Sequence, residues 1–254
     1  MIDKVVSLGD ITSYRYGSTS PFISHLFFTN DSLLFAKANN RNCKTVRRIL
    51  VDYEIASGQV VNFNKSAICT SKSVSRVIGD RLANIVGVKL VKCRERYLGL
   101  PSFARRNKRQ LFDGLKDRIW SKVLGWNNKL FSAGGKEVLL KAMVQSIPSY
   151  TMNLFRLLEG FISDVHHLCS RFWWGSSDSE RKLQWGLWAK LCSGKSACGL
   201  GFRDLSLFNQ AMLTKQCWRL IKWPNSLVAR VVKGRYFPTT DFLHVVTGGS
   251  DSFV

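Results

Sequence analysis

The stretch Ile23-Ser-His-Leu-Phe-Phe-Thr-Asn-Asp-Ser-Leu-Leu-Phe35 decides how the first part of the chain folds. Its two apolar arms have the β-branched and aromatic content of strands. Between them, Asn30-Asp31 is a turn dipeptide, because both side chains hydrogen-bond readily to nearby backbone. The sequence therefore predicts a β-hairpin over residues 23–36. Taken alone, an Asn-Asp pair between apolar strands is usually a turn and nothing more.

Further strand-like runs and one helix flank the hairpin. Residues 11–17 have strand composition, and 60–63 and 97–101 are shorter strand candidates. A helix is predicted after the hairpin, with Ser57-Gly58 as its stop signal. Its apolar face is expected to carry Cys43, Val46, Leu50 and Tyr53. Its basic face is expected to carry Lys44, Arg47 and Arg48.

From about Phe103 onward the pattern becomes helical. Ser163 and Asp204 are expected to cap two of the helices, while Gly175 and Pro224 end them. The expected apolar stripes are Leu111, Leu115 and Ile119; Val138, Leu139, Ala142 and Met143; Val165, Leu168, Cys169 and Phe172; and Leu207, Phe208, Ala211 and Trp218. The predicted fold class is α+β, with short antiparallel strands and helices first and a helical half after them.

Composition points to a globular protein with an anionic partner. The chain has 254 residues, 45% of them hydrophobic, and carries 38 Lys and Arg against 17 Asp and Glu, a net charge of +21. Such an excess of one sign repels itself in a compact domain, so nucleic acid is the first expected partner. An anionic membrane surface is less favoured, because the basic residues are dispersed rather than gathered in one tail. A basic protein without a polyanion partner remains the alternative.

The seven cysteines do not form a recognisable metal or disulfide framework. No His near Cys192 and Cys198 completes a zinc set, and His166-His167 are adjacent rather than at helical ligand spacing. Four others lie among apolar residues and are expected to pack as small core side chains: Cys43, Cys69, Cys169 and Cys217. A reducing, intracellular compartment is expected. The chain shows neither an apolar run of membrane-spanning length nor a secretory signal at Met1.

The hairpin and the blocks that follow it resemble, in order, the reverse transcriptase of plant non-LTR (LINE-type) retrotransposons. The hairpin is similar to that family's catalytic "ISHL-FADD-SLLF" hairpin. The later matching blocks are Ser57-Gly-Gln-Val-Val-Asn-Phe-Asn-Lys-Ser66, Tyr97-Leu-Gly-Leu-Pro101, Ser132-Ala-Gly-Gly-Lys-Glu137, Ile147-Pro-Ser-Tyr-Thr-Met152, Phe172-Trp-Trp-Gly175, Trp185-Gly-Leu-Trp188, Gly199-Leu-Gly-Phe-Arg203 and Phe208-Asn-Gln-Ala211. Ordered blocks over about residues 10–238 make this resemblance specific.

The resemblance implies an organisation and a chemistry. Residues 1–103 would be part of a polymerase palm, 104–160 a helical thumb, and 161–254 a connecting region that stops before zinc-binding and ribonuclease H-like regions. The family polymerises DNA on an RNA template with Mg²⁺, whose paired ions stabilise the attacking and leaving oxygens. A template-primer partner and a nuclear location are expected on the same ground.

Two departures from the family predict that the chain does not polymerise DNA as it stands. The family turn is Ala-Asp-Asp, whereas this chain has Thr29-Asn30-Asp31. Asn30 therefore replaces the metal-binding Asp with a neutral amide, and Asp31 remains only as a doubtful metal ligand. The other catalytic Asp and the fingers lie upstream in the family, so a truncated fragment is expected. The alternatives are a non-catalytic nucleic-acid-binding module and a chain that does not fold stably.

The remaining candidate residues come from the same blocks. Lys65 matches a family lysine that could protonate the leaving pyrophosphate, and a solvated surface lysine is the alternative. The candidates for template-primer contact are Tyr97, Leu98 and Gly99, then the basic run Arg105, Arg106, Lys108 and Arg109, and Lys136 in the thumb-like block. Two interpretations compete with template-primer contact. Tyr97 and Leu98 could instead be buried in the palm, and the basic run could instead be a solvated linker. The tryptophans are expected mainly in helix packing, with base stacking as the alternative.

Overall fold

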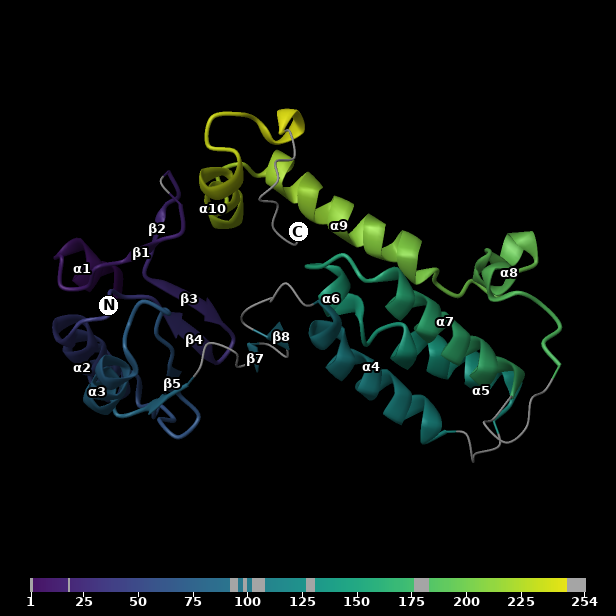
Figure 1. Ribbon diagram of the computed structural model, residues 1–254, viewed down its shortest axis with the longest axis horizontal. Helices are drawn as coiled ribbons and strands as arrows, with labels where there is room; N and C mark the ends of the chain where they lie inside the picture. Colours follow the sequence, from purple (N-terminus) through teal and green to yellow (C-terminus); the bar gives the residue numbers. More distant parts are fainter. Residues whose placement is uncertain are drawn as a thin grey trace. The chain divides into compact units, whose positions relative to one another are not determined.

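The computed structural model describes two compact units within the chain (Figure 1). Unit 1 comprises Met1–Phe103 and Trp223–Val246, and unit 2 comprises Ala104–Lys222 and Thr247–Val254. The structure describes residues 2–17, 19–91, 96–97, 100–101, 108–126, 131–175 and 183–245, without the side chains of 96, 97, 100, 101 and 108–111. The predicted α+β class is confirmed, with helix predominating. The predicted palm, thumb and connecting region remain a prediction.

The elements divide between the units as follows. Unit 1 contains α1 (Ile2–Ser7), β1 (Tyr14–Arg15), β2 (Phe22–Ile23), β3 (His25–Phe28), β4 (Asp31–Leu34), α2 (Asn40–Ser57), β5 (Ala67–Ile68), α3 (Arg76–Val86), β6 (Lys89–Leu90), β7 (Arg96–Tyr97), β8 (Leu100–Pro101), α10 (Leu227–Tyr236) and η3 (Phe242–His244). Unit 2 contains α4 (Lys108–Leu124), α5 (Ala133–Leu139), η1 (Leu140–Val144), α6 (Ser149–Met152), α7 (Glu159–Trp174), α8 (Trp188–Cys192), η2 (Lys195–Ala197) and α9 (Leu205–Lys222).

The predicted hairpin is confirmed, but its turn lies one residue earlier. β3 and β4 pair antiparallel, and Phe28 is opposite Asp31. The turn is therefore Thr29-Asn30, and Asp31 is the first residue of β4. Thr29 has a φ of 52°, in the left-handed region that a β-branched residue rarely adopts. A two-residue loop between twisted strands requires positive φ, which explains this conformation.

The other strands are very short, and one pairing differs from the expectation. β1–β2 and β7–β8 are antiparallel, as predicted, but β5 and β6 pair in parallel. Helix α3 lies between β5 and β6 in the sequence, and a crossover of this kind returns the chain in the same direction. The strand expected at 60–63 is wrong. Asn62 Oδ1 instead accepts a hydrogen bond from the Lys65 N–H at 3.1 Å and holds this segment as a turn.

Helix α2 ends where predicted, but its two faces differ from the prediction. Gly58 ends it in the left-handed conformation, as the stop signal indicated. Tyr53, expected in the core, is 43% exposed, whereas Ile49 is buried. Arg47 is not on a solvated face: it donates to the Val86 carbonyl at 3.3 Å and lies 4.2 Å from the Phe63 ring centre. Arg47 therefore ties α2 to the end of α3.

Unit 2 is organised around one apolar core. Sixteen buried side chains form it, among the described residues, and they come from α4, η1, α6, α7, α9 and the loops between them. On its surface, Lys116 of α4 pairs with Asp164 of α7 at 2.6 Å. The confirmed core residues include Leu115, Ile119, Val165 and Phe172. The predicted helical packing of this half is therefore correct in outline.

Of the stripe expected at Val138, Leu139, Ala142 and Met143, only Leu139 packs against the core. Val138 is 64% exposed, and Ala142 and Met143 are exposed as well. Helix α5 continues into a π-helical turn, η1, which rotates the side chains that follow, and Leu140 and Val144 are fully buried there instead. A strict 3.6-residue period cannot anticipate such a turn.

Three of the four expected helix ends are correct and one is wrong. Helix α9 ends at Lys222, shortly before Pro224, as expected. Asp204 caps α9, since its Oδ1 accepts from the N–H groups of Ser206 at 2.8 Å and Leu207 at 3.2 Å. Gly175 ends α7 in the left-handed conformation. Ser163 does not cap α7, because the helix already begins at Glu159 and Ser163 is an exposed interior residue.

Several residues expected in the core are instead at the surface. Cys69 is exposed, whereas Cys43 and Cys169 are buried as predicted. Trp120, Trp126, Trp173 and Trp188 pack against the unit 2 core. Trp185, Trp218 and Trp223 are 80%, 60% and 51% exposed. Amphipathic periodicity identified the helices correctly but overestimated how much of each is covered.

Candidate nucleic-acid interface

The tip of the β3–β4 hairpin is where the sequence resemblance places polymerase chemistry. Asn30 and Asp31 are both exposed there, and Phe27 and Phe28 on the neighbouring strand are 60% and 57% exposed. Asn30 offers one neutral carbonyl oxygen, which cannot offset the charge of a divalent cation as a carboxylate does. The hairpin tip thus presents a single carboxylate, that of Asp31, beside a neutral amide.

The residues around the tip do not fit a two-metal site. Across the described ranges, no group of three or more His, Cys, Asp or Glu side chains is arranged to hold a metal ion. Lys65 lies in the exposed Asn62–Ser66 turn, whose backbone is held by Asn62. We therefore derive no metal-dependent step from these residues, and the roles of Asp31 and Lys65 stay predictions.

The predicted template-primer residues lie largely outside the described part of the chain. Tyr97 is in β7, with its side chain undescribed; Leu98, Gly99, Arg105 and Arg106 are outside the described residues; Lys108 and Arg109 begin α4, again without described side chains. Lys136 is described: its Nζ donates to the Trp173 carbonyl oxygen at 3.2 Å. This contact joins α5 to the end of α7, so Lys136 has a structural partner in unit 2.

A basic groove in unit 2 was not anticipated from the sequence. Arg118 and Lys122 on α4 face η1 and the turn after it across a shallow groove of about 200 Å³. Ser121 and Ser146 add hydroxyl groups to the same groove. Guanidinium, ammonium and hydroxyl groups are the donors that proteins use to hold phosphate oxygens. The spacing of Arg118 and Lys122, one helical turn apart, was the available sequence signal.

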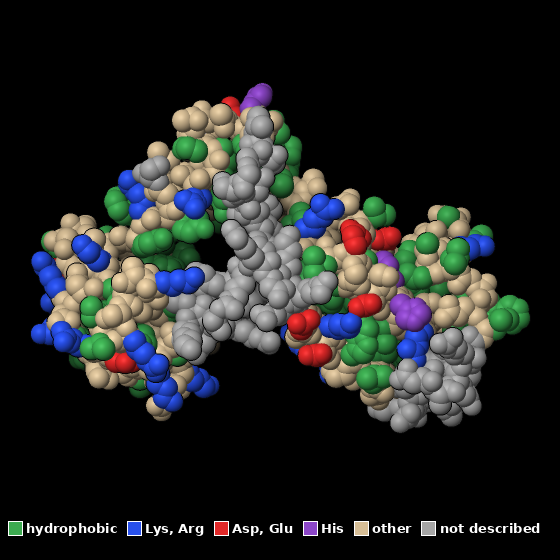
Figure 2. All heavy atoms as spheres, viewed as in Figure 1, with side chains coloured by type: hydrophobic (Ala, Val, Ile, Leu, Met, Phe, Trp, Pro, Cys, Tyr) green, Lys and Arg blue, Asp and Glu red, His purple; other side chains and the backbone are tan. Residues whose placement is uncertain are grey.

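Unit 1 carries a second basic surface. Figure 2 shows Lys and Arg side chains spread over the part of unit 1 that contains α2 and α3. Lys44, Arg48, Arg76 and Arg81 are exposed there. Some of these charges are paired, as Arg48 is with Asp10 at 3.5 Å and Arg76 with Asp80 at 3.9 Å. Exposed pairs of this kind are weak, so a strong polyanion can compete for them.

Cys169 is buried in unit 2, and Cys192 is partly buried. Burial raises the pKa of Cys169 to about 12 and that of Cys192 to about 11. Both thiols therefore stay protonated near neutral pH, which makes them poor nucleophiles and metal ligands. A hydrogen bond from Lys141 lowers the pKa of Glu137, and the same ammonium also donates to the Leu200 carbonyl at 2.6 Å.

Two buried amides hold the segments of unit 2 together, and no sequence pattern had indicated their role. Asn209 Nδ2 donates to the carbonyls of Met152 and Phe155 at 2.9 and 3.0 Å, and its Oδ1 accepts from the Leu157 N–H at 2.9 Å. Gln145 makes a reciprocal pair with the Arg203 backbone, with both distances 3.2 Å. These amides connect segments that are far apart in the sequence.

The described helices lack the combination of length and apolar character that a bilayer crossing requires.

No known protein-family model matches the chain. Over 137 residues it is 31% identical to the Arabidopsis thaliana protein named "Putative ribonuclease H protein At1g65750", covering 54% of this chain but only 22% of that protein. The chain thus spans about a fifth of that relative.

A second relative is matched over most of its own length. The chain is 39% identical over 109 residues to the "Uncharacterized mitochondrial protein AtMg00310" of Arabidopsis thaliana. The aligned region is 42% of this chain and 71% of that protein. The chain therefore belongs to the same protein family as this uncharacterized Arabidopsis protein.

Proposed function

We propose that the chain is a retrotransposon-derived reverse-transcriptase fragment that has lost polymerase activity and keeps the ability to bind nucleic acid. The ordered sequence blocks support the origin. The plant relative named for ribonuclease H also fits, because the resembled retrotransposon family carries a ribonuclease H-like region downstream. The family alone does not specify reverse transcriptase, so the polymerase origin is part of the proposal.

The proposed loss of polymerase activity rests on the tip of the β3–β4 hairpin. Asn30 occupies the turn beside Asp31, at the position where the resembled enzymes have a metal-binding Asp. Removing one preorganised electrostatic element from an active site commonly lowers the rate by about a hundredfold or more. Among the described residues, Asp31 belongs to no group of three or more His, Cys, Asp or Glu side chains that could hold a metal ion.

Primer extension tests this proposal. The purified chain is incubated with an RNA template, an annealed DNA primer and Mg²⁺ or Mn²⁺, and no template-dependent product is expected. The Asn30→Asp variant is also expected to give none, because a single restored carboxylate does not complete a metal pair. Template-dependent synthesis by either protein would overturn the loss of activity.

Nucleic-acid binding rests on a separate observation, the basic groove of unit 2 together with the net charge of +21. Binding to a primer-template duplex should weaken steeply as salt rises, because counterions are released on binding. The double change Arg118→Gln and Lys122→Gln should weaken binding and lower the salt slope by about 0.9 for each phosphate that is no longer neutralised. A flat salt response of the unchanged chain would contradict nucleic-acid binding altogether.

A further inference from the structure

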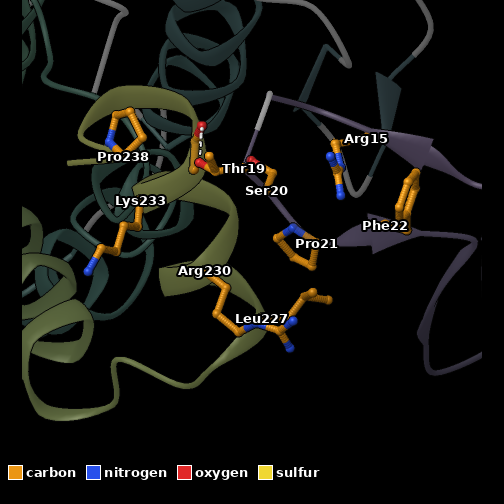
Figure 3. A pocket seen from close by; sticks show the side chains of 10 residues that line it. Arg15, Thr19, Ser20, Pro21, Phe22, Leu227, Arg230, Lys233 and Pro238 are labelled. Carbon is orange, nitrogen blue, oxygen red and sulfur yellow. Dashed lines mark hydrogen bonds between the residues drawn. The ribbon is translucent and has the colours of Figure 1, made fainter.

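A cavity in unit 1 lies where helix α10 docks against the segment that joins β1 and β2 (Figure 3). The docking is close. Thr19 Oγ1 donates to the Gly234 carbonyl at 3.3 Å, and Ser20 Oγ donates to the Val231 carbonyl at 3.2 Å. A Cβ on Gly234 would lie 2.4 Å from the Ser20 backbone nitrogen, so only glycine permits this approach. The two walls of the cavity are therefore held by specific contacts.

The cavity is of ligand size and lined by cations. Its volume is about 570 Å³, within the range of roughly 300–1,000 Å³ that small-molecule sites occupy. Arg15 comes from β1, and Arg230 and Lys233 from α10. Among the described residues that line it, none is acidic. Three like charges around one hollow repel each other, and an anionic ligand would relieve that repulsion.

An exposed aromatic ring lies beside these cations. Phe22 is 62% exposed, and the Arg15 guanidinium carbon lies 4.2 Å from its ring centre. Figure 3 shows Arg15 and Phe22 next to each other on the strands, with Arg230 on the facing helix. Proteins that bind single strands combine cations for the phosphates with aromatic faces on which bases stack. A bare phosphate or sulfate would use the cations alone and leave the ring unused.

We propose that this cavity binds a nucleoside phosphate, presented as one unit of a single-stranded nucleic acid. Arg15, Arg230 and Lys233 contact the phosphate, and the base lies against Phe22. Thr19 and Ser20 position the wall by binding the α10 backbone. The assignment rests on the proposed nucleic-acid binding and gives it a specific site in unit 1. A free nucleotide offers the same chemistry, so the experiment separates the two sources.

The test measures fluorescence anisotropy of a labelled twelve-residue oligothymidylate over a range of salt concentrations. The double change Arg230→Gln and Lys233→Gln should weaken binding about tenfold and lower the salt slope by about 0.7 for each phosphate that the cavity no longer neutralises. The matched control is Arg156→Gln with Lys215→Gln, two exposed cations of unit 2 that lie outside its basic groove and remove the same charge. The control should bind within about twofold of the unchanged chain. Circular dichroism and thermal melting confirm that each variant is folded.

Two further measurements test whether the base stacks on Phe22 and whether the bound phosphate belongs to a strand or to a free nucleotide. Phe22→Ala should weaken oligonucleotide binding about tenfold, and Phe22→Tyr should retain it, because both rings stack. Thymidine monophosphate should compete only at much higher concentration than the strand. Competition by the mononucleotide at equal concentration would overturn the assignment to a strand.

The remaining outcomes distinguish this site from the broader proposal. If the unchanged chain binds the strand but the cavity variants bind equally well, the cavity assignment is wrong and nucleic-acid binding stands. An equal loss in the Arg156 and Lys215 control also overturns the cavity, because it indicates diffuse charge attraction. If the unchanged chain binds no single strand, the cavity assignment is wrong, and the primer-template titration decides the broader proposal separately.

Discussion

Units 1 and 2 are stabilised in different ways. Unit 2 has a single core of sixteen buried side chains among its described residues, reinforced by the buried amides of Gln145 and Asn209. Among the described residues of unit 1, the main apolar cluster has three buried members, Cys43, Leu82 and Val86. Unit 1 instead depends on helix caps, on Arg47 and on the close contact at Gly234. Apolar burial therefore dominates one unit, and specific polar and backbone contacts dominate the other.

Units 1 and 2 also differ in how many apolar side chains they leave exposed. Unit 1 leaves Tyr14, Phe22, Phe27 and Phe28 largely exposed around its short strands. Exposed aromatic side chains beside unpaired strand edges are typical of surfaces that bind a partner. Unit 2 covers most of its apolar side chains with its own helices. We infer that unit 2 contributes most of the stability and unit 1 more of the contact surface.

The largest effect is expected from the centre of the unit 2 core. Phe202 is 2% exposed and lies 4.9 Å from the Trp188 ring and 5.5 Å from Trp173 between ring centres. Phe202→Ala should lower the free energy of unfolding by about 3–5 kcal/mol, because apolar burial decreases and a cavity forms. Urea unfolding followed by tryptophan fluorescence measures it. Trp185→Ala, at an 80% exposed position, is the control and should change it by less than about 0.5 kcal/mol.

The second-largest loss of stability is expected when a buried amide is removed. Asn209→Ala leaves the Leu157 N–H and the Met152 and Phe155 carbonyls without their side-chain partner. The expected loss is about 3 kcal/mol, because each unsatisfied buried group costs about 1–3 kcal/mol. The neighbouring exposed Gln210→Ala is the control in the same urea titration. Equal stability of the two variants would mean that Asn209 does not hold α9 in place.

A smaller and more local effect is expected in unit 1. Gly234→Ala places a methyl group against the Ser20 backbone, which cannot move aside as a flexible side chain could. Overpacking of this kind costs about 1–3 kcal/mol. Hydrogen exchange should accelerate in α10 and in residues 19–22 while the helices of unit 2 keep their protection. Val228→Ala, on the exposed side of α10, should leave exchange unchanged.

The smallest effect is a pH dependence confined to unit 2. His166 Nε2 accepts a hydrogen bond from the Leu205 N–H at 3.1 Å, which requires the neutral ring. Burial lowers the pKa of His166, and the nearby Asp204 charge only partly opposes this. The unfolded chain then takes up a proton below its ordinary pKa of about 6.5 while the folded chain resists it. Stability is therefore complete above that value and falls as pH drops toward the lowered pKa.

Urea midpoints at pH 7.5 and pH 5 measure this dependence. His166→Gln should reduce the difference between the two midpoints, because no buried ring remains to be protonated. The exposed neighbour provides the control, and His167→Gln should retain the full difference. The same dependence in both variants would assign the effect to other groups.

Local features were predictable from the sequence, and long-range ones were not. The hairpin, the α2 stop at Gly58 and the Asp204 cap depend on neighbouring residues, so composition and spacing indicated them correctly. The parallel β5–β6 pairing was not predicted, and the buried face of η1 was predicted wrongly, because a crossover and a π-helical turn change direction and phase. For the candidate site, the sequence identified Asn30 and Asp31. It did not identify the basic groove of unit 2 or the cavity of unit 1.

The sequence by itself determined the family resemblance, the excess of positive charge and the amide at the hairpin tip, because these are properties of residues and their order. Only the tertiary structure decided which cations share a site. Thr19 and Gly234 are 215 positions apart, and no periodic pattern links them. Their contact exists because a glycine lets two backbones approach, and it brings Arg15 and Arg230 to the same cavity. Folding thus converts a dispersed charge into a defined candidate site.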